Sequence, residues 1–415
     1  MGPLSRLTIL AVLLAAPVGP IAAQAPRPPV VVQCTPTSIS GSFGVVRTGN
    51  PIVAALRRAG PGSVIRLAPG VYPSFSIGVN GNAPYVARAS GAPGRPIRIV
   101  GAGDVRIRGG PKTQDTILIA QQSRTEHVHF SGLTIEPGWR AAVMFARGGV
   151  HSGFHFTDCR IVGGYDHVKQ RGRPSKWGVW GSQLRDFVFE GVRERAEVKF
   201  LRDEHAFYLQ NLRGDVRIEN VLCVGVGRTF CQITARASEG PPGIGRVTLR
   251  DCLVLDPGLA PGDGHKGGSA ITLGGRHTGT MLLERCTVRV GFNARLRKLT
   301  RPGVPYGTGA LVAVDGHETV PNGELVVRDC RFEFADGCGD RPVVSVGGVR
   351  EFRLEGANRI VAGGEHPALA LDPPRYGGGS APGSRLVERV TVSTATKVVG
   401  GVTRLGRETT LDAID

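Results

Sequence analysis

Several features that mark common protein classes are missing from this sequence. Its eight cysteines include no Cys-x-x-Cys spacing, which argues against a zinc site of that kind. After the first 25 residues, no apolar run is long enough to form a transmembrane helix. No shift in composition marks a linker, although the chain is long enough for two or three domains. The sequence therefore predicts one water-soluble body without an integral membrane segment.

The first residues have the pattern of a secretory signal peptide. Arg6 precedes the apolar run Leu7–Ala16, and small residues from Ala22 onward offer a cleavage site. We assign residues 1–23 to the signal peptide, 24–60 to a lead-in and capping helix, 61–400 to the main body and 401–415 to a tail. Such a leader predicts an exported protein, located in a periplasm or outside the cell.

Acidic residues are scarce relative to basic ones. Asp and Glu number 34 against 51 Lys and Arg, which gives a formal net charge of +17. This balance fits plain solubility, and it also fits a cationic surface that attracts an anionic partner. Because an exported protein meets acidic polysaccharide more readily than nucleic acid, we expect an acidic polysaccharide as the partner and no nucleic acid. The sequence leaves the oligomeric state open.

Glycine and proline are abundant, with 61 and 29 residues. The glycines separate short β-branched runs, which indicates frequent turns in an all-β chain rather than disorder. One unit, apolar-x-apolar-x-x-(Cys or apolar)-x-apolar, recurs mostly at intervals of about 26 to 34 residues. Its copies include Val128–Ile135, Phe154–Ile161, Val216–Cys223, Val247–Val254, Met281–Val288 and Leu325–Phe332.

A second class of strand lies between these units, in segments such as AVMFAR, WGVWGS, AFYLQN, CQITAR and AITLGG. Two alternating strand classes with turns between them are typical of stacked β-coils, in which each coil buries its face against its neighbours. The repeat therefore predicts a single solenoid.

Most of the cysteines follow the same repeat. We expect an internal stack without a covalent role for Cys159, Cys252, Cys286 and Cys330, which share one position, and for Cys223 and Cys231. Cys34 and Cys338 lie off the pattern, and they could pair with each other or cap the ends.

Ahead of the first repeat, a short amphipathic helix is predicted over Pro51–Gly60, followed by GSVIRLAPGVYPSFSI and GAPGRPIRIVGAGDVRIRGG. This order resembles the N-terminal cap and first coils of the pectate-lyase-like superfamily, most closely the chondroitinase B and alginate lyase type. The motifs cover roughly Ile52–Gly110, and the repeat pattern covers the rest. The resemblance implies an all-β fold, a single right-handed parallel β-helix with a short N-terminal capping helix, and leaves the chemistry open.

The catalytic stretches expected from that superfamily are not visible. The sequence has neither the acidic, Asn-Gly-led stretch of the alginate lyase and chondroitinase B type nor the paired aspartates of polygalacturonases. The clustered aspartates that bind calcium in pectate lyases are also missing. The resemblance therefore transfers no catalytic residue. No metal ligand is predicted, and Ca²⁺ stays open as a cofactor through loop oxygens such as that of Asp263.

The chemistry that the residues favour lies between Asp203 and Gly240. Two strand-like segments place Tyr208 and Gln232 on the outward face if their apolar neighbours point inward. β-Elimination on a uronate requires a base, an acid and a group that neutralises the carboxylate. We predict His205 and Tyr208 as base and acid, and the neutralising group is sought among Arg228, Gln232 and Arg236.

Aromatic and basic residues near these positions are predicted to bind the substrate. Aromatic faces stack on sugar rings, and arginine forks bind carboxylate or sulfate at two points. The predicted binding residues are Arg147, Lys169, Trp177, Trp180, Glu204, His265 and Lys266.

These predictions describe an exported polysaccharide lyase that cleaves an acidic, uronate-containing polymer. Two alternatives stay open: a glycoside hydrolase or epimerase on the same substrate class, for which Glu204 and Glu239 could supply an acid pair, and a non-catalytic carbohydrate-binding or adhesion protein. Each candidate residue also has a structural alternative. His205 could bridge to a turn, Tyr208 could be an exposed aromatic of a rung, and Arg228 could satisfy turn carbonyls.

Overall fold

The computed structural model describes residues 27–78, 85–86, 88–109, 112–120, 125–149, 151–163, 177–199, 205–235, 240–258, 269–292, 309–313, 321–336, 338, 341–372, 386–404 and 407–410. The predicted signal peptide, residues 1–23, lies outside these ranges, and so does the end of the predicted tail, 411–415. Within them, no helix has the length and hydropathy that crossing a bilayer requires.

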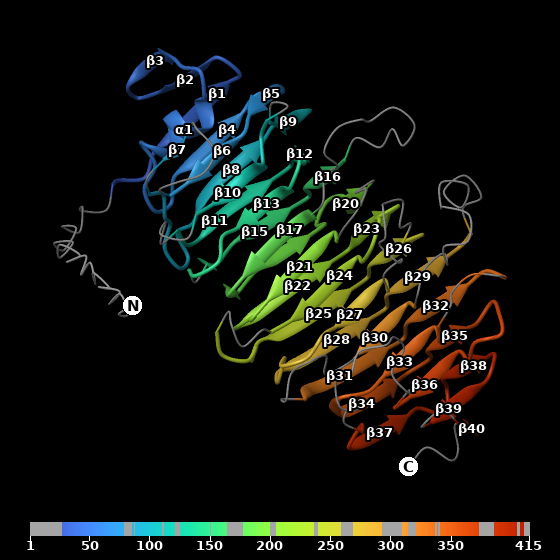
Figure 1. Ribbon diagram of the computed structural model, residues 1–415. Coiled ribbons are helices and arrows are strands. Elements are labelled where there is room, and N and C mark those ends of the chain that lie inside the picture. The colour runs from blue at the N-terminus through green and yellow to red at the C-terminus, as the bar shows by residue number, and fades with distance from the viewer. Residues whose placement is uncertain are drawn as a thin grey trace, which may run out of the picture.

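The chain winds into a right-handed parallel β-helix, as predicted, and three long sheets run along its axis (Figure 1). We call the 14-stranded sheet A, the 11-stranded sheet B and the 13-stranded sheet C. Successive coils add one strand to each sheet, and neighbouring coils pair in parallel. A small fourth sheet pairs β14 (His151–Ser152) with β18 (Leu184–Arg185).

The strands of each long sheet are given in spatial order. Sheet A comprises β3 (Gly44–Arg47), β2 (Ser38–Gly41), β1 (Val31–Thr35), β4 (Val64–Leu67), β8 (Ile97–Gly101), β11 (Val128–Ser131), β15 (His155–Thr157), β19 (Val188–Glu190), β22 (Asp215–Glu219), β25 (Arg246–Arg250), β28 (Thr280–Glu284), β31 (Asn322–Arg328), β34 (Val349–Glu355) and β37 (Arg389–Val392). Sheet B comprises β5 (Gly70–Pro73), β9 (Val105–Arg108), β12 (Thr134–Glu136), β16 (Arg160–Val162), β20 (Ala196–Lys199), β23 (Val221–Val224), β26 (Leu253–Leu255), β29 (Thr287–Val290), β32 (Arg331–Phe334), β35 (Arg359–Val361) and β38 (Lys397–Val399). Sheet C comprises β7 (Tyr85–Val86), β6 (Phe75–Ile77), β10 (Asp115–Ile119), β13 (Ala141–Phe145), β17 (Trp177–Ser182), β21 (Phe207–Gln210), β24 (Cys231–Thr234), β27 (Ile271–Leu273), β30 (Leu311–Ala313), β33 (Val344–Val346), β36 (Leu369–Leu371), β39 (Val402–Arg404) and β40 (Arg407–Thr409).

The predicted repeat unit corresponds to two strands rather than one. Its first half forms a strand of sheet A, its second half forms a strand of sheet B, and one residue between them turns the chain with a positive φ. That residue is Gly132 at 65°, Asp158 at 52°, Asn220 at 51°, Asp251 at 54°, Asp329 at 53° and, as the exception in type, Arg285 at 51°. Gly, Asn and Asp tolerate this left-handed conformation better than other residues do, which explains their recurrence there. Asn220 has this turn role, and its side-chain amide also donates to the Gly191 carbonyl at 3.0 Å.

Inward-facing apolar residues of all three sheets form one continuous core. Aromatic side chains at equivalent positions stack on each other in the N-terminal half. The Phe130 and Phe156 rings lie 4.7 Å apart, and the Phe156 and Phe189 rings lie 6.0 Å apart. Because each coil is only one strand thick, its core residues contact the coils before and after it more than residues of their own coil.

The predicted cysteine stack is confirmed. All eight cysteines are buried and free. At the repeated position the thiol donates to a carbonyl of the preceding coil: Cys252 to Ile218 at 3.4 Å and Cys286 to Leu249 at 3.3 Å. Burial raises the pKa of the Cys159 thiol to about 12, so this thiol stays protonated and unreactive. Of the two roles left open for Cys34 and Cys338, pairing is wrong, because both are free thiols.

The two ends of the solenoid are closed differently. At the N-terminal end, β1, β2 and β3 pair antiparallel, and the capping helix α1 (Pro51–Leu56) packs beside them. The Asn50 side chain accepts the Val53 amide at 3.1 Å, as a helix N-cap does, and the helix ends at Leu56, earlier than the predicted Gly60. At the C-terminal end, β40 pairs antiparallel with β39 at the edge of sheet C.

The aromatic stack predicts a large destabilisation from a single truncation. Phe156→Ala is expected to lower the free energy of unfolding by about 3–5 kcal/mol, because it removes buried surface and leaves a cavity between adjacent coils. Denaturant unfolding of the purified protein measures this change. The neighbouring Thr157 points outward, so Thr157→Ala serves as the control, with an expected change within about 0.5 kcal/mol. Equal stability of the two variants would contradict a core held by stacking between coils.

A buried histidine makes the stability depend on pH. His277 is 1% exposed and lies where a side chain on the adjacent Gly243 would collide with the imidazole. Burial lowers the pKa of His277 to about 4 from its ordinary value near 6.5. Between pH 6.5 and pH 4, His277 is therefore protonated in the unfolded chain and neutral in the folded chain. The free energy of unfolding falls as the pH falls through this range.

We expect His277 alone to remove about 3 kcal/mol of stability between pH 7 and pH 4, since one pKa unit corresponds to about 1.4 kcal/mol. The variant His277→Gln cannot take up this proton, so its unfolding free energy should fall less over the same interval. Denaturant titrations at several pH values measure both slopes. Identical slopes would show that His277 titrates equally in the folded and unfolded chains.

Candidate functional site

One row of outward-facing side chains crosses the middle of sheet C. In-register pairs place Met144 beside Trp180, Trp180 beside Tyr208, Tyr208 beside Gln232 and Gln232 beside Thr272. The alternation predicted from the apolar neighbours is therefore right, because Phe207 and Leu209 lie in the core on either side of Tyr208. Consecutive coils bring the predicted aromatic and amide groups to one outer face.

His205 lies at the start of the β21 coil and joins this row through its side chain. Its Nε2 and Oε1 of Gln232 are 2.6 Å apart, so Nε2–H donates to the amide oxygen. The imidazole also stacks on the ring of Tyr208, with ring centroids 4.9 Å apart and planes 24° apart. With Nε2 as the donor, the other ring nitrogen is Nδ1, and this atom is buried.

The phenol of Tyr208 has a fixed hydrogen-bond partner. The side-chain amide of Gln210, two residues further along the same outward face, donates to the Tyr208 oxygen at 3.1 Å. The phenol oxygen accepts this bond, and a tyrosine hydroxyl can also act as a donor. The pair His205 and Tyr208 thus unites a basic nitrogen and a hydroxyl within one cluster.

The N-terminal side of the row is apolar and is bordered by a guanidinium group. Leu118, Ala141, Met144, Trp180 and Tyr208 form a cluster outside the main core. Exposed Arg147 places its guanidinium carbon 5.0 Å from the centre of the Trp180 ring. A cation in this position is attracted by the ring face.

The row is largely covered, a feature that the sequence did not reveal. Trp180 and Tyr208 are each 8% exposed, and His205 is 4% exposed. Gln232 and Arg228 are partly exposed, and Arg228 lies on the coil next to His205, where the Ala206 amide donates to the Thr229 carbonyl. A polymer approaching this face would meet Arg147, Arg228 and Gln232 before it met the aromatic rings.

Several predicted site residues fall on other parts of the chain. Trp177 begins strand β17, and its backbone pairs with Ala141. The remaining predicted residues lie outside the described residues: Lys169, Glu204, Arg236, His265 and Lys266. Within the described part of the chain, no group of three or more His, Cys, Asp or Glu side chains could hold a metal ion.

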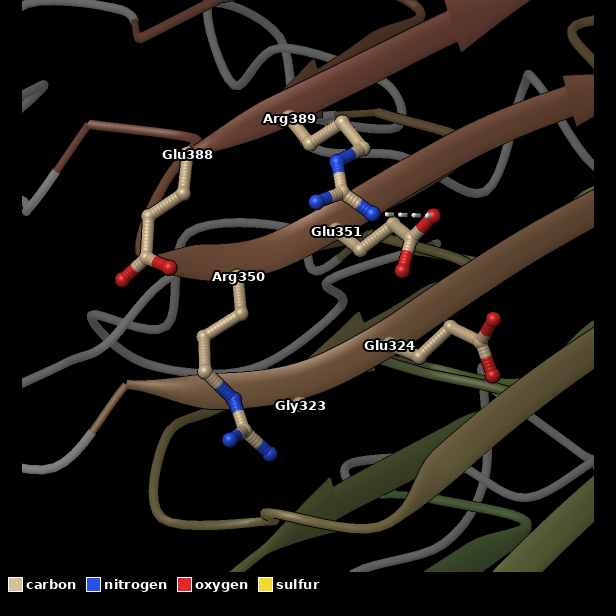
Figure 2. Close-up of a pocket in the computed structure, with 6 residues that line it drawn as sticks. All are labelled: Gly323, Glu324, Arg350, Glu351, Glu388 and Arg389. Carbon is tan, nitrogen blue, oxygen red and sulfur yellow. Dashed lines mark ion pairs between the residues drawn. The ribbon is translucent and has the colours of Figure 1, made fainter.

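A hollow that sequence reasoning missed lies on the outer face of sheet A near the C-terminal end (Figure 2). It encloses about 260 Å³ and is lined by Gly323, Glu324, Arg350, Glu351, Glu388 and Arg389. Glu324 and Glu351 lie in register on β31 and β34, at the same position of consecutive repeats, which is the signal that could have found them.

Two of the three carboxylates of this hollow, those of Glu324 and Glu351, are matched by guanidinium groups. Arg353 pairs with Glu324, and Arg389 lies 3.8 Å from Glu351. Glu324 also accepts a hydrogen bond from Thr280 at 2.9 Å. Because these two carboxylates are held in ion pairs, we interpret this hollow as part of a structural ion-pair ladder and place the candidate site on sheet C.

Comparison with known protein families found no match, and no curated protein matched either. Among solved structures, the chain is similar to an alginate lyase from Paenibacillus sp. FPU-7, with 13% identity, a TM-score of 0.38, and coverage of 88% of this chain and 99% of that one. It is also similar to a pectate lyase, with 12% identity, a TM-score of 0.37, and coverage of 92% and 81%. A third structure is the A-module of a mannuronan C-5 epimerase from Azotobacter vinelandii, with 13% identity, a TM-score of 0.28, and coverage of 85% and 93%.

These neighbours include pectate and alginate lyases, the group to which the N-terminal motifs pointed. The narrower likeness of the cap to the chondroitinase B type stays a prediction. Similarity at this level does not transfer an activity, so the function is argued from the residues of this chain.

The contact between Arg147 and Trp180 predicts a spectroscopic change. Arg147→Ala is expected to increase the quenching of tryptophan fluorescence by acrylamide, because the guanidinium no longer covers one face of the indole. The loss of stability should be small, about 0.5–1 kcal/mol. In a Trp180→Phe background the same substitution should leave quenching unchanged, since Trp139 and Trp177 then account for the signal. A change that persists in that background would place Arg147 elsewhere.

Proposed function

We propose that the protein is an enzyme that acts on an acidic polysaccharide, and that it is a lyase cleaving uronate-containing chains by β-elimination. The observation that carries the proposal is the cluster on sheet C in which His205 donates to Gln232 and stacks on Tyr208. The imidazole of His205, the hydroxyl of Tyr208 and the amide of Gln232 lie together on the outer face of sheet C, and Trp180 and Arg147 lie beside them.

The proposed reaction removes the proton at C5 of a uronate residue and breaks the bond between C4 and its glycosidic oxygen. Nδ1 of His205, which is buried in this structure, takes the C5 proton once the substrate has displaced the side chains that cover it, and the electron pair forms the C4–C5 double bond. The hydroxyl of Tyr208 gives its proton to the departing oxygen. Arg228, with the amide of Gln232, neutralises the uronate carboxylate, which makes the C5 proton acidic enough to remove.

The low exposure of the ring groups favours one competing function. If His205 and Tyr208 only stabilise the stacking of coils, the partly exposed Arg228 and Gln232 and the exposed Arg147 would make a binding surface without catalysis. This second candidate is a carbohydrate-binding or adhesion protein. It predicts retention of an acidic polymer with no change in the polymer.

Product analysis separates these functions. The mature protein is incubated with alginate, pectate, hyaluronan and chondroitin, with and without calcium, while the ultraviolet absorbance of unsaturated uronate is followed. A rise in absorbance supports the lyase. New reducing ends without absorbance would indicate a hydrolase, and binding without either would indicate the non-catalytic protein.

Substitutions at the two central residues test the roles assigned to them. His205→Ala and Tyr208→Phe are each expected to lower turnover at least about a hundredfold, the usual contribution of a general acid or base. Turnover at saturating substrate is the measurement. Thr272→Val, on the same outward row but two coils from Tyr208, is the matched control and should keep its rate. Full activity in both central variants would place the chemistry elsewhere.

A further inference from the structure

The outer faces of sheets A and B carry two ladders of charged side chains that differ in sign pattern. On sheet A, in-register strands alternate Arg250, Glu284, Arg328 and Glu355. Each arginine lies next to a carboxylate, at 2.7 Å for Arg250 to Glu284 and 2.6 Å for Arg328 to Glu355. This ladder neutralises itself, and it needs no partner outside the chain.

The C-terminal part of sheet B has a different pattern. Arg331, Arg359 and Lys397 occupy the same position on the consecutive strands β32, β35 and β38, and all three are exposed. Arg289 lies beside them on β29, opposite Glu333. We call Arg289, Arg331, Arg359 and Lys397 the sheet B stripe.

One carboxylate, that of Glu333, pairs with the three arginines of the stripe. Glu333 is buried, and its carboxylate forms ion pairs with the guanidinium groups of Arg331 at 2.5 Å, Arg359 at 3.4 Å and Arg289 at 3.4 Å. Among the described residues, every ion pair of the stripe ends on Glu333. Like charges directly opposite on neighbouring strands destabilise a sheet, so the row Arg331, Arg359 and Lys397 is unfavourable without a further anion.

We propose that the sheet B stripe binds a linear acidic polysaccharide that lies along the solenoid axis. Adjacent strands are spaced about 4.7–4.9 Å apart, so Arg331, Arg359 and Lys397 form a straight row of cations one strand apart, with Arg289 two residues to one side of it. A hexuronate chain carries one carboxylate per sugar ring, and a ring is about as long as this spacing. The arginine forks of the stripe can each hold a carboxylate at two points.

The geometry favours such a polymer over nucleic acid. The phosphates of a nucleic-acid duplex follow a helical path. A duplex could therefore contact a straight, flat row of cations over a short length only. Single-stranded nucleic acid binds mainly where several aromatic side chains stack on its bases. Among the described residues beside the stripe, one aromatic ring is exposed, that of Phe292 at 47%. Its ring centre lies 4.2 Å from the guanidinium carbon of Arg289. One ring does not make the series of stacking positions that single-stranded nucleic acid uses.

The choice of a uronate polymer rests on the proposed function, whereas the uncompensated charge of the stripe does not. The stripe lies on sheet B and the candidate catalytic cluster lies on sheet C, so the two are separate surfaces. The stripe would hold the polymer on the protein while the cluster on sheet C acts on it.

The test compares two variants that lose the same charge. One replaces Arg331, Arg359 and Lys397 with Gln. The control replaces Arg66, Arg98 and Arg246, which are exposed arginines of sheet A, with Gln. Binding to alginate and to polygalacturonate is measured by titration over a range of salt concentrations, in a His205→Ala background to suppress turnover.

The stripe variant should bind at least about tenfold more weakly at low salt, and its plot of log affinity against log salt should be shallower by about 2, because fewer counterions are released. The control should change affinity less than about twofold. Wild-type affinity in the stripe variant, or an equal loss in the control, would overturn the proposal. Stronger binding of a single-stranded oligonucleotide or of anionic phospholipid vesicles to the stripe would overturn the choice of polysaccharide.

These outcomes are independent of the outcome for the proposed reaction. If the stripe binds polyuronate while the protein with His205 intact yields no unsaturated product, the proposed lyase fails and the stripe stands. If product forms and the stripe variant binds as the wild type does, the stripe fails and the lyase stands.

Discussion

In-register stacking of parallel strands decides where every side chain of this protein lies. Each coil repeats the coil before it, so a residue that points inward is followed, one strand away, by another that points inward. The core is thereby divided into stacks of like residues, such as the Phe130, Phe156 and Phe189 rings. A shift of one residue in any pairing would exchange the inner and outer faces of that strand.

The same constraint turns the outer face of each sheet into rows with separate properties. Sheet C carries an aromatic and amide row, the ladder on sheet A alternates in sign, and the stripe on sheet B is cationic. None of these rows disturbs the core, because outward positions do not contact it. A fold of this kind can therefore change its surface chemistry row by row while the inner stacks stay the same.

The sequence predicted what depends on the repeat and missed what depends on lateral contacts. The β-helix, the outward position of Tyr208 and Gln232 and the burial of Cys252 and Cys286 all follow from local alternation, and the structure confirms them. The division of one repeat unit into two strands was missed, because a single left-handed residue such as Asp158 makes the bend without interrupting the apolar pattern. The covering of Tyr208 and the bond between His205 and Gln232 could not be predicted, since they join residues 27 positions apart through side chains alone.

The different closures of the two ends have a consequence for how such a chain changes length. Antiparallel pairing closes the N-terminal edge of sheet A and, through β40, the C-terminal edge of sheet C, while every coil between them meets its neighbours in the same way. Duplication of an internal coil, about 30 residues, would therefore create no new kind of junction. Evolution can therefore lengthen or shorten the β-helix between its two closed ends, and each outer row then gains or loses one residue for every coil added or removed.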